Sequence, residues 1–114
     1  MSNLTKQELE ACSADTPSVV PEEVKQLKKQ ISDWHVVEKQ GQLKLEKLYK
    51  FPDFQQAISF TKAIGDLAEL EGHHPALLTE WGKVTVSWWT HDIAGLHKND
   101  YIMAAKTDEI REKF

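Results

Sequence analysis

The chain has 114 residues, which is enough for one compact domain and too few for two. Its 14 basic and 18 acidic residues give a net charge of −4, which argues against the clustered basic face of a nucleic-acid-binding protein. No apolar run approaches the roughly 20 residues of a membrane span, the N-terminus lacks the pattern of a secretion signal, and the single cysteine allows no internal disulfide. We therefore expect a soluble, cytoplasmic protein.

Residues 1–20 have the composition of a lead segment that precedes the folded domain. Thr5 and Glu8 have the spacing of a capping box, which predicts a short helical turn. The stretch 13–20 is small, polar and interrupted by proline, as is typical of a linker. We expect one domain over residues 21–114.

Within this domain, strand-like and helical segments follow one another. Alternating residue patterns predict four strands in two hairpins, 34–38 with 42–49 and 77–80 with 83–90. Helices are predicted to begin at Pro21, to run from Asp53 to about Gly72, and to run from Lys98 or Asn99 to about Arg111. This order predicts an α+β fold, with a four-stranded antiparallel sheet and helices packed on one face.

The same patterns predict which side chains form the core. Six residues of the middle helix follow the helical period: Phe54, Ala57, Ile58, Thr61, Ile64 and Ala68. Three residues of the last helix are expected to point inward: Ile102, Met103 and Ile110. Strand alternation places Trp88 in the core. Trp34 and Trp81 fit either the edge of the core or the apolar wall of a pocket.

Three histidines that are separated along the chain are predicted to meet at one end of the sheet. If Trp81-Gly82 forms a two-residue loop, the hairpin register continues back to place His73 opposite Thr90 and brings His74 and His91 to the same rim. Trp-Gly is not a preferred loop pair, so the register could differ by one residue. A shift of one residue would still leave the three imidazoles at that rim.

Imidazole can take up or release a proton near neutral pH, since its unperturbed pKa is about 6.5. Glu69 stands four residues before His73 and can reach the same rim. A metal site is a weaker interpretation, because adjacent residues in extended chain, such as His73 and His74, point to opposite faces. The sequence contains no phosphate-binding or dinucleotide-binding motif and no nucleophile elbow. General acid–base chemistry without a metal or cofactor is the interpretation that remains.

A long motif links these residues: Glu69-x-x-x-His73-His74-Pro75, then Trp81, His91 and Asp100. Its residues and spacings resemble the signature of the pterin-4a-carbinolamine dehydratases, and the likeness covers roughly residues 20–112. The chain is most similar to the bacterial branch that is found with phenylalanine hydroxylase. It departs from the animal members at Gly72, where they carry an aspartate, so any role of that carboxylate is not carried over.

The resemblance implies a hydro-lyase that dehydrates 4a-hydroxytetrahydrobiopterin to quinonoid dihydropterin and so recycles the cofactor of phenylalanine hydroxylase. It implies that His73, His74 and His91 line the pterin pocket, with His73 and His91 as the acid–base pair and His74 mainly holding the substrate. Because family members form homodimers and homotetramers, we expect a homo-oligomer, with the hydroxylase as a candidate partner. The transcriptional role of the animal members is not expected of this acidic chain.

Four further residues are expected to bind or orient the substrate: Glu69, Thr90, Trp34 and Asp100. Glu69 would orient a histidine, and Thr90 would contact the pterin through its backbone or its hydroxyl. Asp100 has a second explanation, because it would stand at the third position of the last helix if His97 were its N-cap. The alternative for the whole chain is a non-catalytic interaction module of the same fold. The complete set of histidines argues against that alternative.

Overall fold

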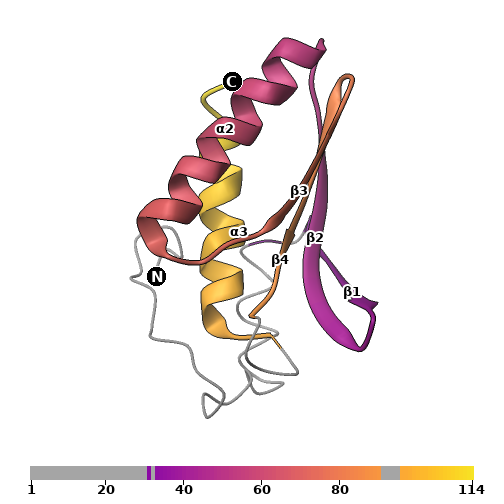
Figure 1. Cartoon of the computed structure of the whole chain (residues 1–114), viewed down its shortest axis with the longest axis vertical. Coiled ribbons are helices and arrows are strands. Elements are labelled where there is room, and N and C mark those ends of the chain that lie inside the picture. The colour runs from indigo at the N-terminus through magenta and orange to yellow at the C-terminus, as the bar shows by residue number, and fades with distance from the viewer. Residues whose placement is uncertain (1–30, 32, 91–95) are drawn as a thin grey trace.

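The computed structural model describes residue 31, residues 33–90 and residues 96–114. The helical turn expected at Thr5, the linker, the start of the helix expected at Pro21, and His91 all lie outside the described residues. The described part has the α+β architecture that the sequence predicts. Helices α2 and α3 lie against the same face of a four-stranded sheet, as Figure 1 shows.

The sheet is built from two hairpins that join through their second strands. Its strands are β1 (His35–Lys39), β2 (Gln42–Lys50), β3 (Ala76–Glu80) and β4 (Lys83–Trp88). They lie in the order β1-β2-β4-β3, and every neighbouring pair is antiparallel. The central pair places Leu45 opposite Trp88, and both side chains are fully buried beneath the helices.

Short turns set the register of both hairpins. Gln40 and Gly41 have φ angles of 54° and 77°, the positive values that a tight two-residue hairpin loop requires. In the second hairpin Glu80 pairs with Lys83, which confirms the predicted register. This pairing ends at Ala76 with Ser87, however, so the expected pairing of His73 with Thr90 is wrong. The preceding Pro75 has no N–H to contribute to a longer ladder.

Helix α2 (Phe54–Glu71) has capped ends, as the sequence predicts. The side chain of Asp53 accepts a hydrogen bond from the backbone N–H of Gln56 at 2.8 Å. The buried face, however, is rotated from the predicted stripe and consists of Ala57, Phe60, Ile64 and Ala68. Phe54 and Ile58 are 43% and 48% exposed. The reason is tertiary, because Phe60 completes an aromatic cluster with Tyr49 and Phe51.

Helix α3 (Lys98–Arg111) runs antiparallel to α2 across the sheet (Figure 1). Ile102 and Met103 are fully buried, and Ile110 packs against the edge of the core, as predicted. The antiparallel arrangement brings the end of α2 beside α3, where Lys106 donates to Glu71 at 3.0 Å. Among the described helices, neither has the length and apolarity needed to cross a bilayer.

The three tryptophans discussed above take different positions. Trp88 is fully buried, which confirms the prediction from strand alternation. Trp34 is also buried, at 1% exposure, and its ring meets that of Tyr49 edge to face. Trp81 stands in the turn of the second hairpin and is 73% exposed. The structure therefore places Trp34 in the core and Trp81 on the surface.

Candidate functional site

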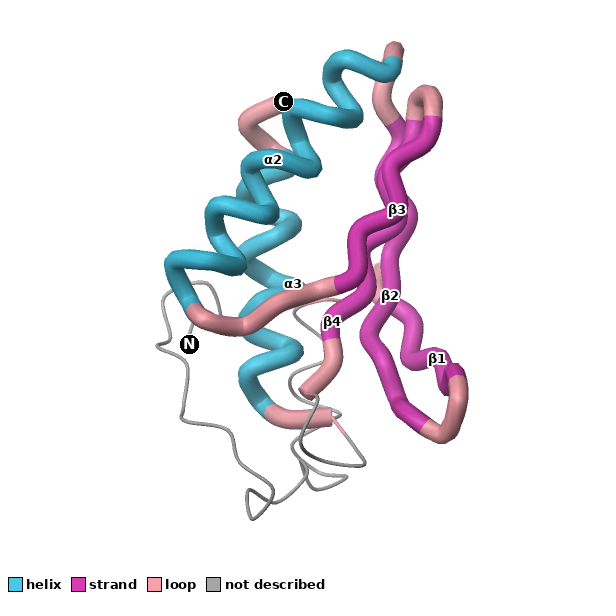
Figure 2. The backbone as a smooth tube through the Cα atoms, in the orientation of Figure 1, coloured by secondary structure: helices cyan, strands magenta, loops and turns pink. Residues whose placement is uncertain are grey.

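The loop after α2 directs His73 into the space between α3 and the end of β4. Gly72 has a φ of 66°, a left-handed conformation that a residue with a side chain adopts only with strain. The backbone N–H groups of Gly72 and His73 both bond to the carbonyl of Ala68, which closes the helix. Figure 2 shows the chain then crossing from α2 toward β3.

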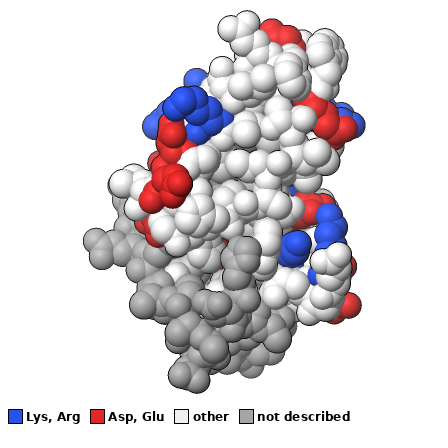
Figure 3. All heavy atoms as spheres, in the orientation of Figure 1, with Lys and Arg blue, Asp and Glu red and all other residues white. Residues whose placement is uncertain are grey.

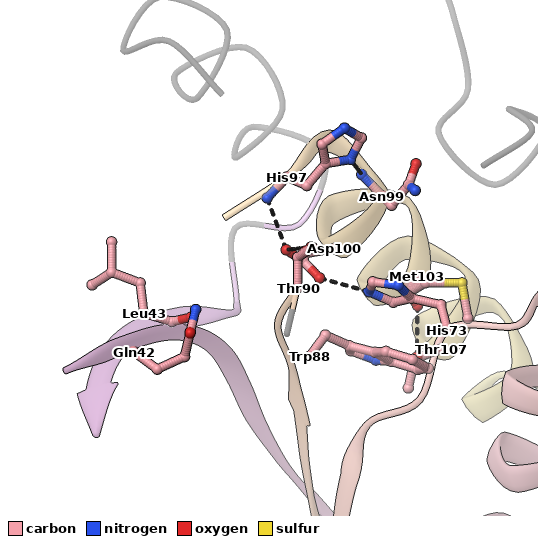
Figure 4. A network of polar contacts seen from close by, with 10 residues as sticks. All are labelled: Gln42, Leu43, His73, Trp88, Thr90, His97, Asn99, Asp100, Met103 and Thr107. Carbon is pink, nitrogen blue, oxygen red and sulfur yellow. Dashed lines mark hydrogen bonds and ion pairs between the residues drawn. The ribbon is translucent and has the colours of Figure 1, made fainter. Parts of the chain in front are cut away.

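Asp100, in the first turn of α3, is the centre of a buried polar cluster. Its Oδ1 lies 2.8 Å from Nε2 of His73, while Oδ2 accepts hydrogen bonds from the hydroxyl of Thr90 at 2.9 Å and from the backbone N–H of His97 at 2.8 Å (Figure 4). The side chain of Asp100 is fully buried, and that of His73 is 9% exposed. We call these three side chains, His73, Thr90 and Asp100, the His73 cluster.

The hydrogen bonds of this cluster determine the state of the imidazole. Two donors already point at Asp100, and the N-terminus of a helix favours negative charge, so its carboxylate acts as an acceptor. A carboxylate can only accept, so His73 donates through Nε2–H. Asp100 thus engages Nε2 and leaves the other ring nitrogen of His73, Nδ1, outside this contact.

The helix-cap explanation for Asp100 is confirmed. His97 is the N-cap of α3, its Nδ1 accepts from the N–H of Asn99, and Asp100 completes the capping box through the backbone of His97. The same carboxylate contacts His73, 27 residues away in sequence. Next to it, burial and then the charge of Asp100 raise the pKa of Tyr101, so this phenol stays neutral.

Trp88 covers one face of the His73 ring. The two ring centroids are 5.8 Å apart and the planes differ by 15°, which is an offset stack. Sequence reasoning assigned Trp88 to the core and missed this contact. A signal was present, because alternation along a strand places Trp88 and Thr90 on the same face of the chain.

His74 points away from the buried cluster. Its Nε2 lies 3.0 Å from Oε2 of Glu69, and both side chains are well exposed, at 58% and 80%. Glu69 therefore contacts one of the paired histidines, and this histidine is His74. Water screens such a pair, so it contributes little to stability.

Of the other predicted site residues, Trp34 lies in a separate part of the molecule. Its Nε1 donates to Oδ2 of Asp108 at 3.1 Å, within the core. His91 lies outside the described residues. Within the ranges that the structure describes, no three His, Cys, Asp or Glu side chains are grouped so that they could hold a metal ion. The described part of the site is thus the His73 cluster with Trp88, and the His74–Glu69 pair beside it.

Comparison with known proteins places this geometry in a family. Residues 17–110 match the family described as pterin 4 alpha carbinolamine dehydratase. A protein of Microcystis aeruginosa, provisionally named a pterin-4-alpha-carbinolamine dehydratase, is 56% identical over 110 residues, which are 96% of this chain and 95% of that protein.

A solved structure supports the same assignment. The crystal structure of a transcriptional coactivator/pterin dehydratase from Brucella melitensis has a TM-score of 0.73 and 26% sequence identity, and the match covers 82% of this chain and 98% of that one. The sequence match, the close relative and the shared fold agree, and the chain belongs to the pterin-4a-carbinolamine dehydratase family.

Proposed function

We propose that this protein is a hydro-lyase that dehydrates 4a-hydroxytetrahydrobiopterin to quinonoid dihydropterin by histidine acid–base catalysis. The observation that carries the proposal is the buried contact between His73 and Asp100. It holds one nitrogen of an imidazole and leaves the other to exchange protons. Family membership supports the reaction, and the cluster supports the way in which the protein performs it.

The reaction needs one proton acceptor and one proton donor. The C4a–O bond breaks and its electron pair leaves with the oxygen. A C4a=N5 double bond forms with the nitrogen's electrons as N5 loses its proton. The departing hydroxyl takes a proton and leaves as water. Nothing is oxidised or reduced, so positioned acids and bases account for the chemistry, each typically worth about 10²- to 10⁴-fold in rate.

His73 and His91 form the proposed acid–base pair. Nδ1 of His73 accepts or gives a proton, and the adjacent carboxylate of Asp100 stabilises the imidazolium whenever the ring is doubly protonated. His91 acts on the other proton of the reaction, in line with its place in the motif. His74, exposed and paired with Glu69, holds the substrate. The roles of Thr90 and Asp100 in binding the pterin are part of the same proposal.

The physiological role that we propose is recycling of the pterin cofactor of phenylalanine hydroxylase in the cytoplasm. Each hydroxylation releases a 4a-hydroxypterin, and an enzyme that removes water from it restores the form that can be reduced again. The hydroxylase is therefore the natural source of the substrate and a candidate partner of this chain.

A homo-oligomer is also part of the proposal, and the surface around α2 and β3 supports it. Phe54 and Ile58 on α2 and Leu78 on β3 are between 43% and 58% exposed. β3 is an edge strand, so its outer hydrogen-bonding groups can pair with another chain. The face in Figure 3 shows an uncharged band between small groups of Lys, Arg, Asp and Glu. Exposed apolar side chains such as Phe54, Ile58 and Leu78 are typical of a protein interface.

A stopped-flow assay tests the activity. 4a-hydroxytetrahydrobiopterin is generated by phenylalanine hydroxylase, and its decay is followed by absorbance with and without this protein. We expect wild-type protein to accelerate the decay and a His73→Ala/His91→Ala double variant to lose the acceleration while its circular dichroism is unchanged. His35→Ala, an exposed histidine on β1, is the matched control and should behave as wild type.

Absence of any acceleration by wild-type protein would contradict the dehydratase proposal. In that case sedimentation of the protein with phenylalanine hydroxylase would test the alternative, a non-catalytic interaction module, for which a stable complex is expected.

A further inference from the structure

Helix α3 contacts the imidazole of His73 by two routes. The first is direct, through Asp100. The second begins at Thr107, seven residues later on the same face of the helix and about 10 Å further along its axis. It passes through Trp88, whose ring stacks on His73 (Figure 4).

The hydroxyl of Thr107 has a defined orientation. It donates to the backbone carbonyl of Met103 at 2.7 Å, which uses its one hydrogen. It therefore accepts from Nε1–H of Trp88, at 3.0 Å. Both Thr107 and Trp88 are fully buried, so no water replaces this acceptor if it is removed.

The two routes constrain different motions of the imidazole. The bond from Nε2 to Asp100 fixes one nitrogen but leaves the ring able to tilt about the line between the two bonded atoms. The stacked indole of Trp88 blocks that tilt, because the two planes lie within 15° of each other. The direction in which Nδ1 points is therefore set by Asp100 and Trp88 together, and Thr107 holds Trp88 in place.

We propose that Thr107 is a positioning residue for His73, acting through the indole of Trp88. The inference rests on the proposed function, since the purpose of the positioning is to aim Nδ1 at the substrate. A loss of about 1 Å in alignment at a reacting atom can cost up to about 100-fold in rate. Thr107 is two contacts away from the imidazole, so its loss is expected to have a smaller effect, on turnover more than on binding.

The test compares Thr107→Val with Thr107→Ser. Valine keeps the volume and removes the acceptor, whereas serine keeps the hydroxyl. We expect Thr107→Val to lower kcat about tenfold with KM changed less than about twofold, and Thr107→Ser to retain kcat within about threefold of wild type. Thr85→Val, the same substitution on β4 at a side chain outside both routes, is the control and should leave kcat unchanged.

A second readout does not depend on activity. In ¹⁵N-histidine-labelled protein, assigned with His73→Gln, the Nε2–H proton of His73 should exchange with solvent about tenfold faster in Thr107→Val than in Thr107→Ser, because a tilted ring weakens the bond to Asp100. Equal exchange and equal kcat in the two variants would overturn the inference. If wild-type protein does not accelerate dehydration, the proposed function fails, and the exchange measurement still decides the positioning role.

Trp88→Phe keeps the test decisive if Thr107→Val does not fold. Phenylalanine retains a stacking ring and lacks the N–H, so it should reproduce the faster exchange of the Nε2–H proton. Wild-type exchange in Trp88→Phe would contradict the relay.

Discussion

Two aspartates on α3 each accept three hydrogen bonds and so form two polar clusters, for which we propose different functions. Asp100 accepts from His73, Thr90 and the backbone of His97. Asp108, two turns later, accepts from Lys47, Trp34 and the hydroxyl of Tyr49, and we call this the Asp108 cluster. Each carboxylate thus receives three hydrogen bonds from described residues, and each ties α3 to the sheet.

The difference between the clusters lies in the chemistry of the donors. Lysine, tryptophan and tyrosine keep their protons throughout the neutral pH range, so the Asp108 cluster has one stable arrangement there. The His73 cluster contains an imidazole, whose two ring nitrogens allow it to donate a hydrogen bond from one while the other accepts. A carboxylate with three donors is therefore not in itself a sign of catalysis. The kind of donor is what distinguishes the proposed proton-transfer site from a structural contact.

The largest expected effect is a difference in dehydratase activity between variants of the two aspartates. Asp100→Asn keeps the shape of the side chain and removes the charge that stabilises the imidazolium of His73, so we expect kcat for dehydration to fall about 10- to 100-fold. Asp108→Asn is the matched control, and its kcat should stay within about threefold of wild type. Equal losses in the two variants, measured by stopped flow, would contradict the division between the clusters.

The second prediction is that the Asp108 cluster contributes to the free energy of unfolding, although it contributes little to activity. Asp108→Asn weakens the hydrogen bonds from Trp34 and Tyr49 and the ion pair with Lys47. We expect the free energy of unfolding in urea to fall by about 1–3 kcal/mol. If the midpoint and slope of the urea transition are unchanged, these contacts make no net contribution to the free energy of unfolding.

The third prediction uses the tyrosine of the Asp108 cluster. Burial, followed by the hydrogen bond and charge of Asp108, raises the pKa of Tyr49 well above its ordinary value. The unfolded chain loses this proton near pH 10, while the folded protein retains it. The stabilisation is therefore fully present below about pH 10 and is lost as the pH rises from there through the folded pKa, at up to about 1.4 kcal/mol per pH unit.

Tyr49→Phe removes this titration. Above pH 10, its free energy of unfolding should decline less steeply with pH than that of wild type, as measured by urea unfolding at pH 8 to 11. At pH 8 the variant should be less stable, because the hydroxyl that donates to Asp108 is gone. Identical slopes above pH 10 would refute the assignment.

The smallest expected effect concerns the exposed pair of His74 and Glu69. Glu69→Gln removes the charge that faces His74, and because both side chains are exposed the free energy of unfolding should change by less than about 0.5 kcal/mol. If His74 holds the substrate, KM for the 4a-hydroxypterin should rise about two- to fivefold with kcat little changed. A fall in kcat alone would instead place His74 in the proton transfer.

Local sequence patterns predicted much of this fold because they concern residues that are close along the chain. Both hairpin turns, the pairing of Glu80 with Lys83, and the caps at Asp53 and His97 follow from backbone preferences and short-range hydrogen bonds. The grouping of His73 with Asp100 was also anticipated, through the motif that they share. The extension of the strand pairing to His73 was wrong, since Gly72 and Pro75 turn the chain before β3 begins.

The sequence by itself thus determined the elements, the hairpin register, the helix caps and the family. The tertiary structure decided which face of α2 is buried, and it separated the buried His73 from the exposed His74. It also brought Trp34 within hydrogen-bonding distance of Asp108, 74 residues away, and placed the ring of Trp88 between Thr107 and His73. The physical reason is that a buried polar side chain takes whichever partner the packing of distant elements brings within about 3 Å. Periodicity along one element contains no information about that partner.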